Sequence, residues 1–437
     1  VVYAAESSPE SDARKDARLR AQAAGVTIRP LPSDDKAAAT ATAGAAVALD
    51  GLFGTGARLP IGDAYQAAAR ALRGRGAPVV AIDIPSGIDT DSGAACDNAV
   101  RATSTIALAA LKPGLLLDPA REHCGDIWVA DIGIEETTLR ECARTYAALD
   151  DNAFLDLLPV RAPESDKRSA GAPLVIAGSE QFPGAAVLCA RGAARAGAGY
   201  VTVATPAPAA AALRAHLVEE VVVTFAHGSP IDAAEDLLDI AQRNSSVAVG
   251  PGLSLDEWTG AMLRHFLERI DLPIVADASA LFHLTKSLEV LRNKKCVLTP
   301  HAGEFARLSG KGTIAPGDRV NRLREFVERT GVTTLLKGNA TLIYDGSRVD
   351  INTTGTQALA TAGTGDVLTG IISTLLSQGV SPFDAARAGA YWHGKAGRLC
   401  AARRRVGVLS GDLPDALGDA IPAHQPPAPL RRLVPQP

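Results

Sequence analysis

Several features that would place a protein in other functional classes are absent from this chain. It has no long run of basic side chains and a formal net charge of −4, so nothing points to nucleic acid or to an anionic membrane. No apolar run reaches the roughly 20 residues needed to cross a bilayer, and no signal peptide is visible. The six cysteines show neither a Cys-x-x-Cys pair nor a cysteine–histidine pairing at metal spacing. We therefore expect free thiols and a cytoplasmic protein.

Aromatic residues and methionine are also scarce. Phe, Trp and Tyr make up 4% of the 437 residues, whereas hydrophobic residues make up 47% and alanine is abundant. Cores of alanine and valine favour close-packed layers of helices and strands, and this length suffices for two domains. Met262 is the single methionine, and residues 1–4 are typical of a strand already under way. Our hypothesis is that residues are missing before Val1.

The spacing of apolar segments predicts an α/β fold. Near-continuous apolar stretches, such as 78–82 and 273–276, alternate with helical segments, as in parallel sheets covered on both faces. Polar or glycine residues follow most of these stretches, where the active residues of such sheets lie. The polar stretch 159–172 is typical of a linker and domain entry. We predict a first domain over residues 1–149, a second over 150–421 and a disordered tail over 422–437.

The strongest chemical signal lies in residues 360–370, where Gly363, Thr364 and Gly365 directly precede Asp366. Glycines let the backbone turn with its N–H groups pointing one way, and a helix N-terminus adds unpaired donors and a positive dipole end. We interpret the three residues as an anion hole for phosphate. Asp366 would then act as a base or orient a hydroxyl. The alternative is a plain helix start with a tight turn.

Other motifs fit the same site. The stretch 337–341 (KGNAT) places a cation, a flexible turn and a hydroxyl after a strand, which suits nucleotide phosphates or ribose. Taken alone, its lysine would be a solvated surface residue. His301 alone is more typical of a loop histidine, and Glu304 of a helix cap. The stretch 250–252 (GPG) is either a turn or a close backbone approach to a planar ligand.

In the predicted first domain, Asp50 and Asp83 each end an apolar strand and precede a turn that contains glycine. Either could be a strand-end turn and nothing more. A carboxylate with a hydroxyl and backbone carbonyls would also suit a hard cation.

Together these motifs resemble the bifunctional NAD(P)H-hydrate repair enzymes, which fuse an NAD(P)H-hydrate epimerase to an ADP-dependent NAD(P)H-hydrate dehydratase. The resemblance covers nearly the whole chain. Its motifs are residues 50–56, 83–87, 112–114, 131–133, 177–179, 184–185, 197–199, 250–253, 299–304, 337–338 and 362–368. It implies an N-terminally incomplete, Rossmann-like epimerase domain followed by a ribokinase-like dehydratase domain.

The resemblance also implies site residues in both domains. Contacts to the hydrated dinucleotide in the dehydratase domain fall on Ala185, Gly252, His301 and Asp366. The adenine-nucleotide site falls on Lys337, Gly338, Asn339, Ala340, Thr341 and Gly365. Hydrate-binding positions of the epimerase domain fall on Gly54, Thr55, Gly56, Ala57, Arg58, Leu59, Pro60 and Asp83. Potassium ligands fall on Asp50 and Ser86.

The activity implied by this resemblance is the dehydration of (6S)-NADHX or NADPHX to NADH or NADPH. ADP, or alternatively ATP, is the expected phosphoryl donor, with Mg²⁺ and K⁺ as cofactors and a homo-oligomer as the assembly. Two departures stand out. The family's early glycine- and asparagine-rich loop is not found, so we expect slow or absent epimerisation of the R and S hydrates. Ser279 also stands where the family usually has aspartate.

Two alternatives remain open from the sequence. A ribokinase-type kinase for a small molecule would share the glycine loop and Asp366, but it would not explain the first domain or the motif around His301. The second alternative is a non-catalytic nucleotide-binding module.

Overall fold

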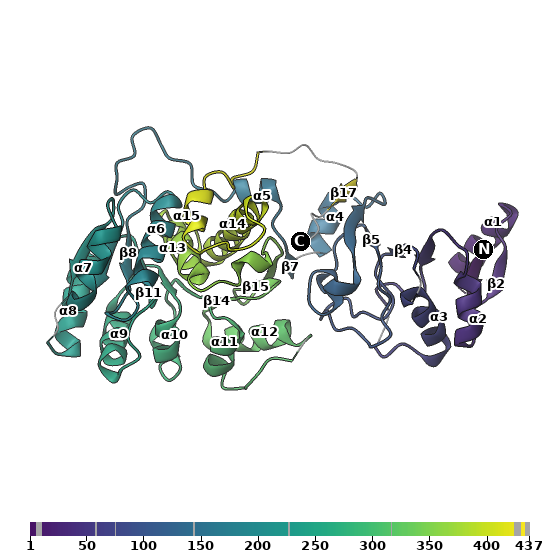
Figure 1. The fold of residues 1–437 in the computed structure, drawn as a ribbon, viewed down its shortest axis with the longest axis horizontal. Coiled ribbons are helices and arrows are strands. Elements are labelled where there is room, and N and C mark those ends of the chain that lie inside the picture. Colours follow the sequence, from purple (N-terminus) through teal and green to yellow (C-terminus); the bar gives the residue numbers. More distant parts are fainter. Residues whose placement is uncertain are drawn as a thin grey trace. The chain divides into compact units, whose positions relative to one another are not determined.

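The computed structural model describes residues 1–5, 11–56, 59–74, 76–142, 145–225, 228–315, 317–423 and 430–432. The chain divides into two compact units, drawn in Figure 1. Unit 1 comprises Val1–Cys142 with Pro427–Pro435, and unit 2 comprises Ala143–Pro426 with Gln436–Pro437. This division falls a few residues before the predicted boundary after residue 149, which stays a prediction.

Unit 1 is built on a mainly parallel sheet with the strand order β17-β6-β5-β4-β3. Strands β3 to β6 are parallel, β17 is antiparallel to β6, and β1 and β2 form a separate parallel pair. Its elements are β1 (Val2–Ala4), α1 (Asp12–Ala23), β2 (Ile28–Pro30), α2 (Asp35–Thr42), β3 (Ala48–Asp50), α3 (Asp63–Arg73), β4 (Val79–Ile82), β5 (Ser104–Leu108), η1 (Pro113–Leu115), η2 (Ala120–His123), β6 (Asp126–Ala130), α4 (Glu136–Cys142) and β17 (Leu430–Arg432).

Strand β17 lies within the segment that we expected to be disordered. Leu430, Arg431 and Arg432 pair with the edge strand β6. A segment rich in proline and glutamine carries no strand pattern of its own, so a pairing of this kind depends on the partner strand.

Unit 2 contains a ten-stranded sheet with the order β10-β9-β8-β11-β12-β13-β14-β15-β16-β7. Strands β10 to β14 in this order are all parallel, and β15 is antiparallel to both of its neighbours. Its strands are β7 (Tyr146–Ala147), β8 (Pro173–Ile176), β9 (Thr202–Thr205), β10 (Val221–Thr224), β11 (Ser246–Val249), β12 (Ile274–Ala276), β13 (Cys296–Leu298), β14 (Thr333–Leu336), β15 (Thr341–Tyr344) and β16 (Val349–Asn352).

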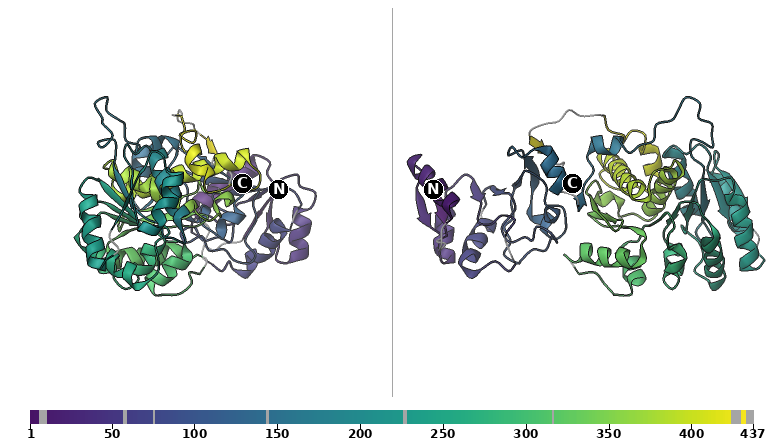
Figure 2. Two further views of the ribbon diagram at one scale, coloured as in Figure 1. Left: turned by 60° about the vertical axis from the view of Figure 1, so that its left-hand side comes forward. Right: turned by 180° about the vertical axis from the view of Figure 1, so that it is seen from behind.

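Helices cover both faces of this sheet, as the apolar strands require. Figures 1 and 2 show α6, α13 and α14 along one face and α9 to α12 along the other. The helices are α5 (Asp151–Leu155), α6 (Pro183–Arg195), α7 (Ala207–His216), α8 (Pro230–Ala241), α9 (Glu257–Arg269), α10 (Ser279–Leu284), η3 (Leu288–Leu291), α11 (Ala302–Ser309), α12 (Arg319–Thr330), η4 (Gln357–Leu359), α13 (Thr364–Ser377), α14 (Pro382–Arg403) and α15 (Asp412–Ala416). In the described ranges, no helix is both long and apolar enough to cross a membrane.

Helix α13 is the centre of the core of unit 2. It packs against α6, α14 and strands β8, β11 and β12, and it is buried from Val367 to Leu376. Glycines permit this depth of packing. A Cβ added to Gly370 would lie 2.1 Å from the Cys189 carbonyl oxygen, and one added to Gly192 would lie 2.7 Å from the Val367 oxygen. The contact between α6 and α13 is therefore made backbone to backbone.

We expect Gly370→Ala to destabilise unit 2. The added methyl group meets backbone atoms that cannot turn aside, and overpacking of a core costs about 1–3 kcal/mol. Gly411→Ala is the matched control, because a Cβ there meets nothing within 4 Å. Urea unfolding of both variants checks the difference, and equal midpoints would contradict the close approach of the two helices.

Candidate active site

The candidate site lies at the carboxyl edge of the sheet of unit 2. The loops that follow β11, β12, β13 and β14 begin with polar or glycine residues, as the sequence predicted, and α13 begins at the same edge. Parallel strands bring such loops together in space. This arrangement gathers residues that are far apart in the sequence.

The predicted anion hole is the first turn of α13. Gly363 is its N-cap with φ +93°, and a Cβ there would lie 2.5 Å from Leu188 Cδ1 and 2.8 Å from Ser410 Oγ. No side chain caps this helix. The Thr364 hydroxyl instead donates to the Leu359 and Thr361 carbonyl oxygens. The Thr364 N–H donates to the Thr361 oxygen at 3.4 Å. The N–H groups of Gly365 and Asp366 and the positive end of the helix dipole are left for an anion, which favours the functional interpretation over a plain helix start.

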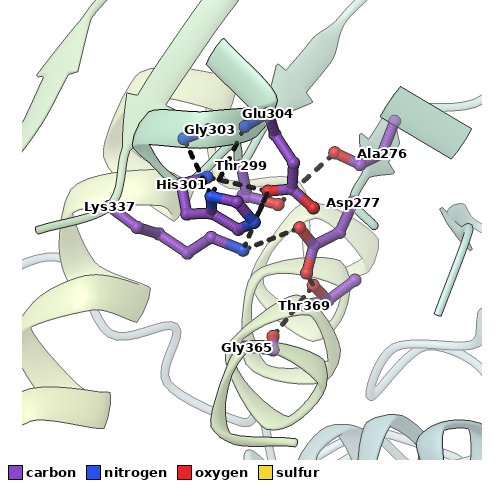
Figure 3. A network of polar contacts seen from close by, with 9 residues as sticks. All are labelled: Ala276, Asp277, Thr299, His301, Gly303, Glu304, Lys337, Gly365 and Thr369. Carbon is purple, nitrogen blue, oxygen red and sulfur yellow. Dashed lines mark hydrogen bonds and ion pairs between the residues drawn. The ribbon is translucent and has the colours of Figure 1, made fainter. Parts of the chain in front are cut away.

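A polar network lies beside this helix start and is drawn in Figure 3. The Lys337 ammonium donates to Asp277 Oδ1 at 2.9 Å and lies 3.9 Å from Glu304 Oε2. The second oxygen of Asp277 accepts from Thr369 Oγ1 on α13 at 2.8 Å. Burial alone would lower the pKa of Lys337, but the attraction of Asp277, Glu304 and Asp366 raises it above its usual value. The lysine is therefore a fixed cation at the site.

Asp366 is a carboxyl of this group with a strongly raised pKa. Burial raises its pKa to about 7, repulsion by Asp277 and Glu304 adds to the rise, and Lys337 opposes it. Among the described residues, none makes a hydrogen bond or an ion pair with its side chain. A carboxylate with a pKa near the ambient pH can exchange a proton, which is what a general base requires.

His301 and Glu304 cap α11 reciprocally. His301 Nδ1 accepts from the N–H groups of Gly303 and Glu304, and Glu304 Oε2 accepts from the His301 N–H at 2.8 Å. The helix-cap alternative therefore holds for Glu304, and His301, expected as a loop histidine, is the N-cap of the same helix. Capping does not conflict with ligand binding, because the imidazole of His301 is exposed and lines the cavity described next.

A cavity of about 470 Å³ opens beside the network. Pockets for drug-sized ligands span about 300–1,000 Å³, so it is large enough for a nucleotide. The predicted residues that line it are His301, Lys337, Gly338, Asn339, Thr341, Thr364 and Gly365. Ala340 is buried and, like Gly363 and Asp366, is not part of this lining.

The predicted residues Ala185 and Gly252 meet at a second point of the same edge. Gly252 has φ +68°, and a Cβ there would lie 2.9 Å from the Ala185 Cβ and 2.5 Å from the Phe182 oxygen. The loop after β11 thus presses against the start of α6. The glycine is required by this close approach.

Three residues of the site were not predicted from the sequence. Asp277 anchors Lys337, Thr369 donates to Asp277, and His393 of α14 lies in the cavity wall. Burial lowers the pKa of His393 to about 4, so it is neutral at pH 7, and its Nε2 is buried without a hydrogen-bond partner in the described structure. Only the position of Asp277 at a strand end could have drawn attention to it.

In unit 1 the predicted cation ligands are in contact. Asp50 and Ser86 are fully buried, and both oxygens of Asp50 accept from Ser86, from its N–H and its hydroxyl, at 2.7 Å. Burial raises the pKa of Asp50, and the bonds from Ser86 oppose the rise. No basic side chain of the described residues pairs with this buried carboxylate.

The other predicted residues of unit 1 lie close by. Asp83 has φ +73°, and its Oδ1 accepts from the Leu108 N–H and from Lys112, which the sequence-based site did not include. A Cβ on Gly54 would lie 3.5 Å from Asp83 Oδ2. Thr55 and Gly56 are exposed, and Leu59 and Pro60 close the turn before α3. Ala57 and Arg58 lie outside the described residues.

Comparison with known proteins identifies the class. Residues 173–422 match the family model described as NAD(P)H-hydrate dehydratase, and residues 1–114 match the model described as YjeF-related protein N-terminus. A ribokinase-like superfamily protein from Enterococcus faecalis superposes with a TM-score of 0.54, at 26% identity, over 63% of this chain and 97% of its own. Unit 2 is therefore a ribokinase-like α/β domain with a nucleotide-sized cavity.

Particular relatives make the family plain. The bifunctional NAD(P)H-hydrate repair enzyme Nnr of Pyrobaculum aerophilum is 35% identical over 86% of this chain and 74% of its own length, and that of Mycobacterium tuberculosis is 40% identical over 77% and 67%. The ADP/ATP-dependent NAD(P)H-hydrate dehydratase of Bacillus subtilis, co-crystallized with ATP/Mg²⁺, has a TM-score of 0.53 at 29% identity, covering 62% of this chain and 96% of its own. This chain belongs to the NAD(P)H-hydrate repair enzymes.

The repulsion between Asp277 and Asp366 gives a direct test of the site. In Asp277→Asn the pKa of Asp366 should fall below its wild-type value, because a neighbouring negative charge is lost and Lys337 is freed. Carboxyl-carbon NMR titration measures this pKa, with Asp366→Asn assigning the signal and the exposed Asp271→Asn as control. An unchanged or higher pKa in Asp277→Asn would contradict the network.

Proposed function

We propose that unit 2 dehydrates (6S)-NADHX and NADPHX to NADH and NADPH at the expense of ADP, with release of AMP and phosphate. The observation that carries this proposal is Asp366, a carboxyl with a pKa of about 7 beside an uncapped helix start and a fixed lysine. The names of the relatives supply the substrate class.

The chemistry follows from a poor leaving group. The hydroxyl on the hydrated nicotinamide ring does not depart readily as hydroxide near neutral pH. Asp366 takes the proton of this hydroxyl while the hydroxyl oxygen forms a bond to the terminal phosphorus of ADP. The bond from that phosphorus to AMP breaks, and AMP leaves. The carbon–oxygen bond of the phosphate ester then breaks, phosphate departs, and loss of a proton from the adjacent carbon restores the ring double bond.

The residues around Asp366 stabilise the charge that develops on the transferred group. The uncapped start of α13 would offer the Gly365 N–H to the anion, and Lys337 adds a cation that Asp277, itself bonded by Thr369, holds in place. Phosphoryl transfer depends mostly on such positioning and charge stabilisation. The cavity beside Lys337 would hold the rest of the adenine nucleotide.

Mg²⁺ fits this edge of the sheet. Asp277, Glu304 and Asp366 outnumber the single ammonium of Lys337. The described residues form no ready cluster of three metal-binding side chains, but Mg²⁺ commonly takes one or two carboxylates together with substrate phosphates. When bound, it would neutralise the phosphates of the donor.

Replacing the proposed base tests the mechanism. We expect Asp366→Asn to bind ADP as wild type does and to turn over roughly 10²-fold more slowly or worse, as loss of general-base catalysis implies. Asp271→Asn should match wild type. Formation of NADH from its hydrate is followed by absorbance and ADP binding by calorimetry, and near-normal turnover would refute this role for Asp366.

The same proposal predicts how kcat/KM depends on pH. A base must be deprotonated, so wild-type kcat/KM should fall about tenfold per pH unit below the pKa of about 7 and level off above it. The residual activity of Asp366→Asn should lack this decrease at low pH.

The identity of the product separates the proposal from a ribokinase-type kinase, because a kinase would accumulate a stable phosphate ester whereas the dehydratase releases inorganic phosphate. Hydrate binding without any turnover would favour the non-catalytic module.

For unit 1 we propose epimerisation of the R and S hydrates, with K⁺ held by Asp50 and Ser86. The buried carboxylate without a basic partner supports a bound cation, since a buried charge needs compensation. Asp83, paired with Lys112 and adjacent to Gly54, is the group placed to contact substrate.

Potassium binding is tested by exchanging salts at constant ionic strength. KCl should raise the unfolding temperature of unit 1 relative to LiCl, because a ligand that binds only the folded state stabilises it. Asp50→Asn should remove this difference. Chromatography of the hydrates under both salts measures epimerisation separately. The same unfolding temperature in KCl and LiCl would argue against a potassium site.

A further inference from the structure

Phe182 is exposed at the edge where the dehydratase site lies. Its side chain is 60% exposed, whereas Phe154, Phe266, Phe305 and Phe326 are buried. It is the N-cap of α6, in the loop that follows β8, and makes no side-chain capping bond. An exposed aromatic ring at the rim of a site contributes little to folding and is typical of a binding surface.

The backbone around Phe182 is held firmly. Its N–H donates to the oxygen and to the hydroxyl of Ser179, both at 3.2 Å, and Pro183 fixes the first position of α6. Gly252 presses against the Phe182 oxygen and Cβ. A ring on such a support loses little freedom when a ligand binds it.

The neighbouring loop is clamped as well. Ser279 Oγ donates to the Leu253 oxygen at 2.6 Å, and His283 Nε2 donates to the Ser254 oxygen at 2.9 Å. Both donors come from α10. The two loops that meet at Gly252 are therefore preformed, and the ring of Phe182 stands at their junction.

Phe182 lies away from the anion hole along α6. Leu188 contacts Gly363, and Phe182 precedes Leu188 by six residues along α6. At about 1.5 Å per residue, this places Phe182 about 9 Å along the helix axis from that contact. If Asp366 acts on the hydrated nicotinamide ring, the group that contacts Phe182 belongs to another part of the same substrate.

The adenine nucleotide donor does not compete for this position, because Phe182 does not line the cavity beside Lys337. The hydrated nicotinamide ring is no longer aromatic and stacks poorly. The adenine of the dinucleotide has a flat π face that an exposed aromatic ring accepts. We propose that Phe182 stacks on the adenine ring of the hydrated dinucleotide and contributes to substrate affinity; this inference rests on the function proposed above.

The experiment compares two substrates and two positions. Phe182→Ala should raise the KM for NADH hydrate roughly 5- to 100-fold, as loss of one stacked base implies, with kcat and the KM for ADP unchanged. The hydrate of reduced nicotinamide mononucleotide, which has no adenine, should show no such rise. Phe182→Trp, which keeps an aromatic ring, should have a KM for NADH hydrate close to that of wild type. Val218→Ala is the control, since Val218 is 87% exposed and lies between α7 and β10.

Two results would overturn the proposal. An unchanged KM for NADH hydrate in Phe182→Ala would show that the ring makes no energetic contact, and an equal rise for both hydrates would show that adenine is not the partner. If the wild-type protein turns over neither hydrate, the proposed function fails by itself. Calorimetry of NADH hydrate binding to wild type and Phe182→Ala then decides the role of Phe182, with equal affinity overturning it.

Discussion

The ion pair between Asp277 and Lys337 is the interaction on which the active site depends. It joins the ends of strands β12 and β14, and through Thr369 it also ties both to α13. Three carboxylates share this one ammonium, and the surplus of negative charge helps to keep a proton on Asp366 near neutral pH. Without the lysine the carboxylates would repel one another, and without Asp277 the lysine would lose its place. The pair thus sets the charge and the geometry of the proposed base together.

The core of unit 2 holds the start of α13 in place beside this ion pair. Helix α13 presents its uncapped start to the site while its remaining turns are buried against α6. Gly370 and Gly192 allow the backbones of the two helices to touch, and Gly363 lets Leu188 and Ser410 close around the first turn. The position of the helix start therefore depends on close packing up to about 9 Å along the helix, at about 1.5 Å per residue.

Much of this arrangement could be predicted from the sequence, because the carboxyl ends of parallel strands meet at one edge and glycine-rich loops mark them. Lys337 and Gly365 were placed at one site on that ground and His301 through the family resemblance, and the structure brings all three to one cavity. Asp277 was missed as the anchor of Lys337 because their contact spans 60 residues and depends on side-chain reach. His393 lies within a long buried helix, where nothing in the spacing distinguishes it from core. The strand β17 pairs with a distant edge strand and has no local pattern that would reveal it.

Ser279 shows how a departure from the family pattern can be compatible with the site. An aspartate is usual at this position, and its loss removes a negative charge from an edge that already holds Asp277, Glu304 and Asp366. The serine hydroxyl donates to the Leu253 oxygen, a bond that an ionised carboxylate could not make because it has no proton to donate. The exchange thus converts an acceptor into a donor and fastens the loop that supports Gly252. In this chain the position carries no charge, and its side chain holds the loop after β11.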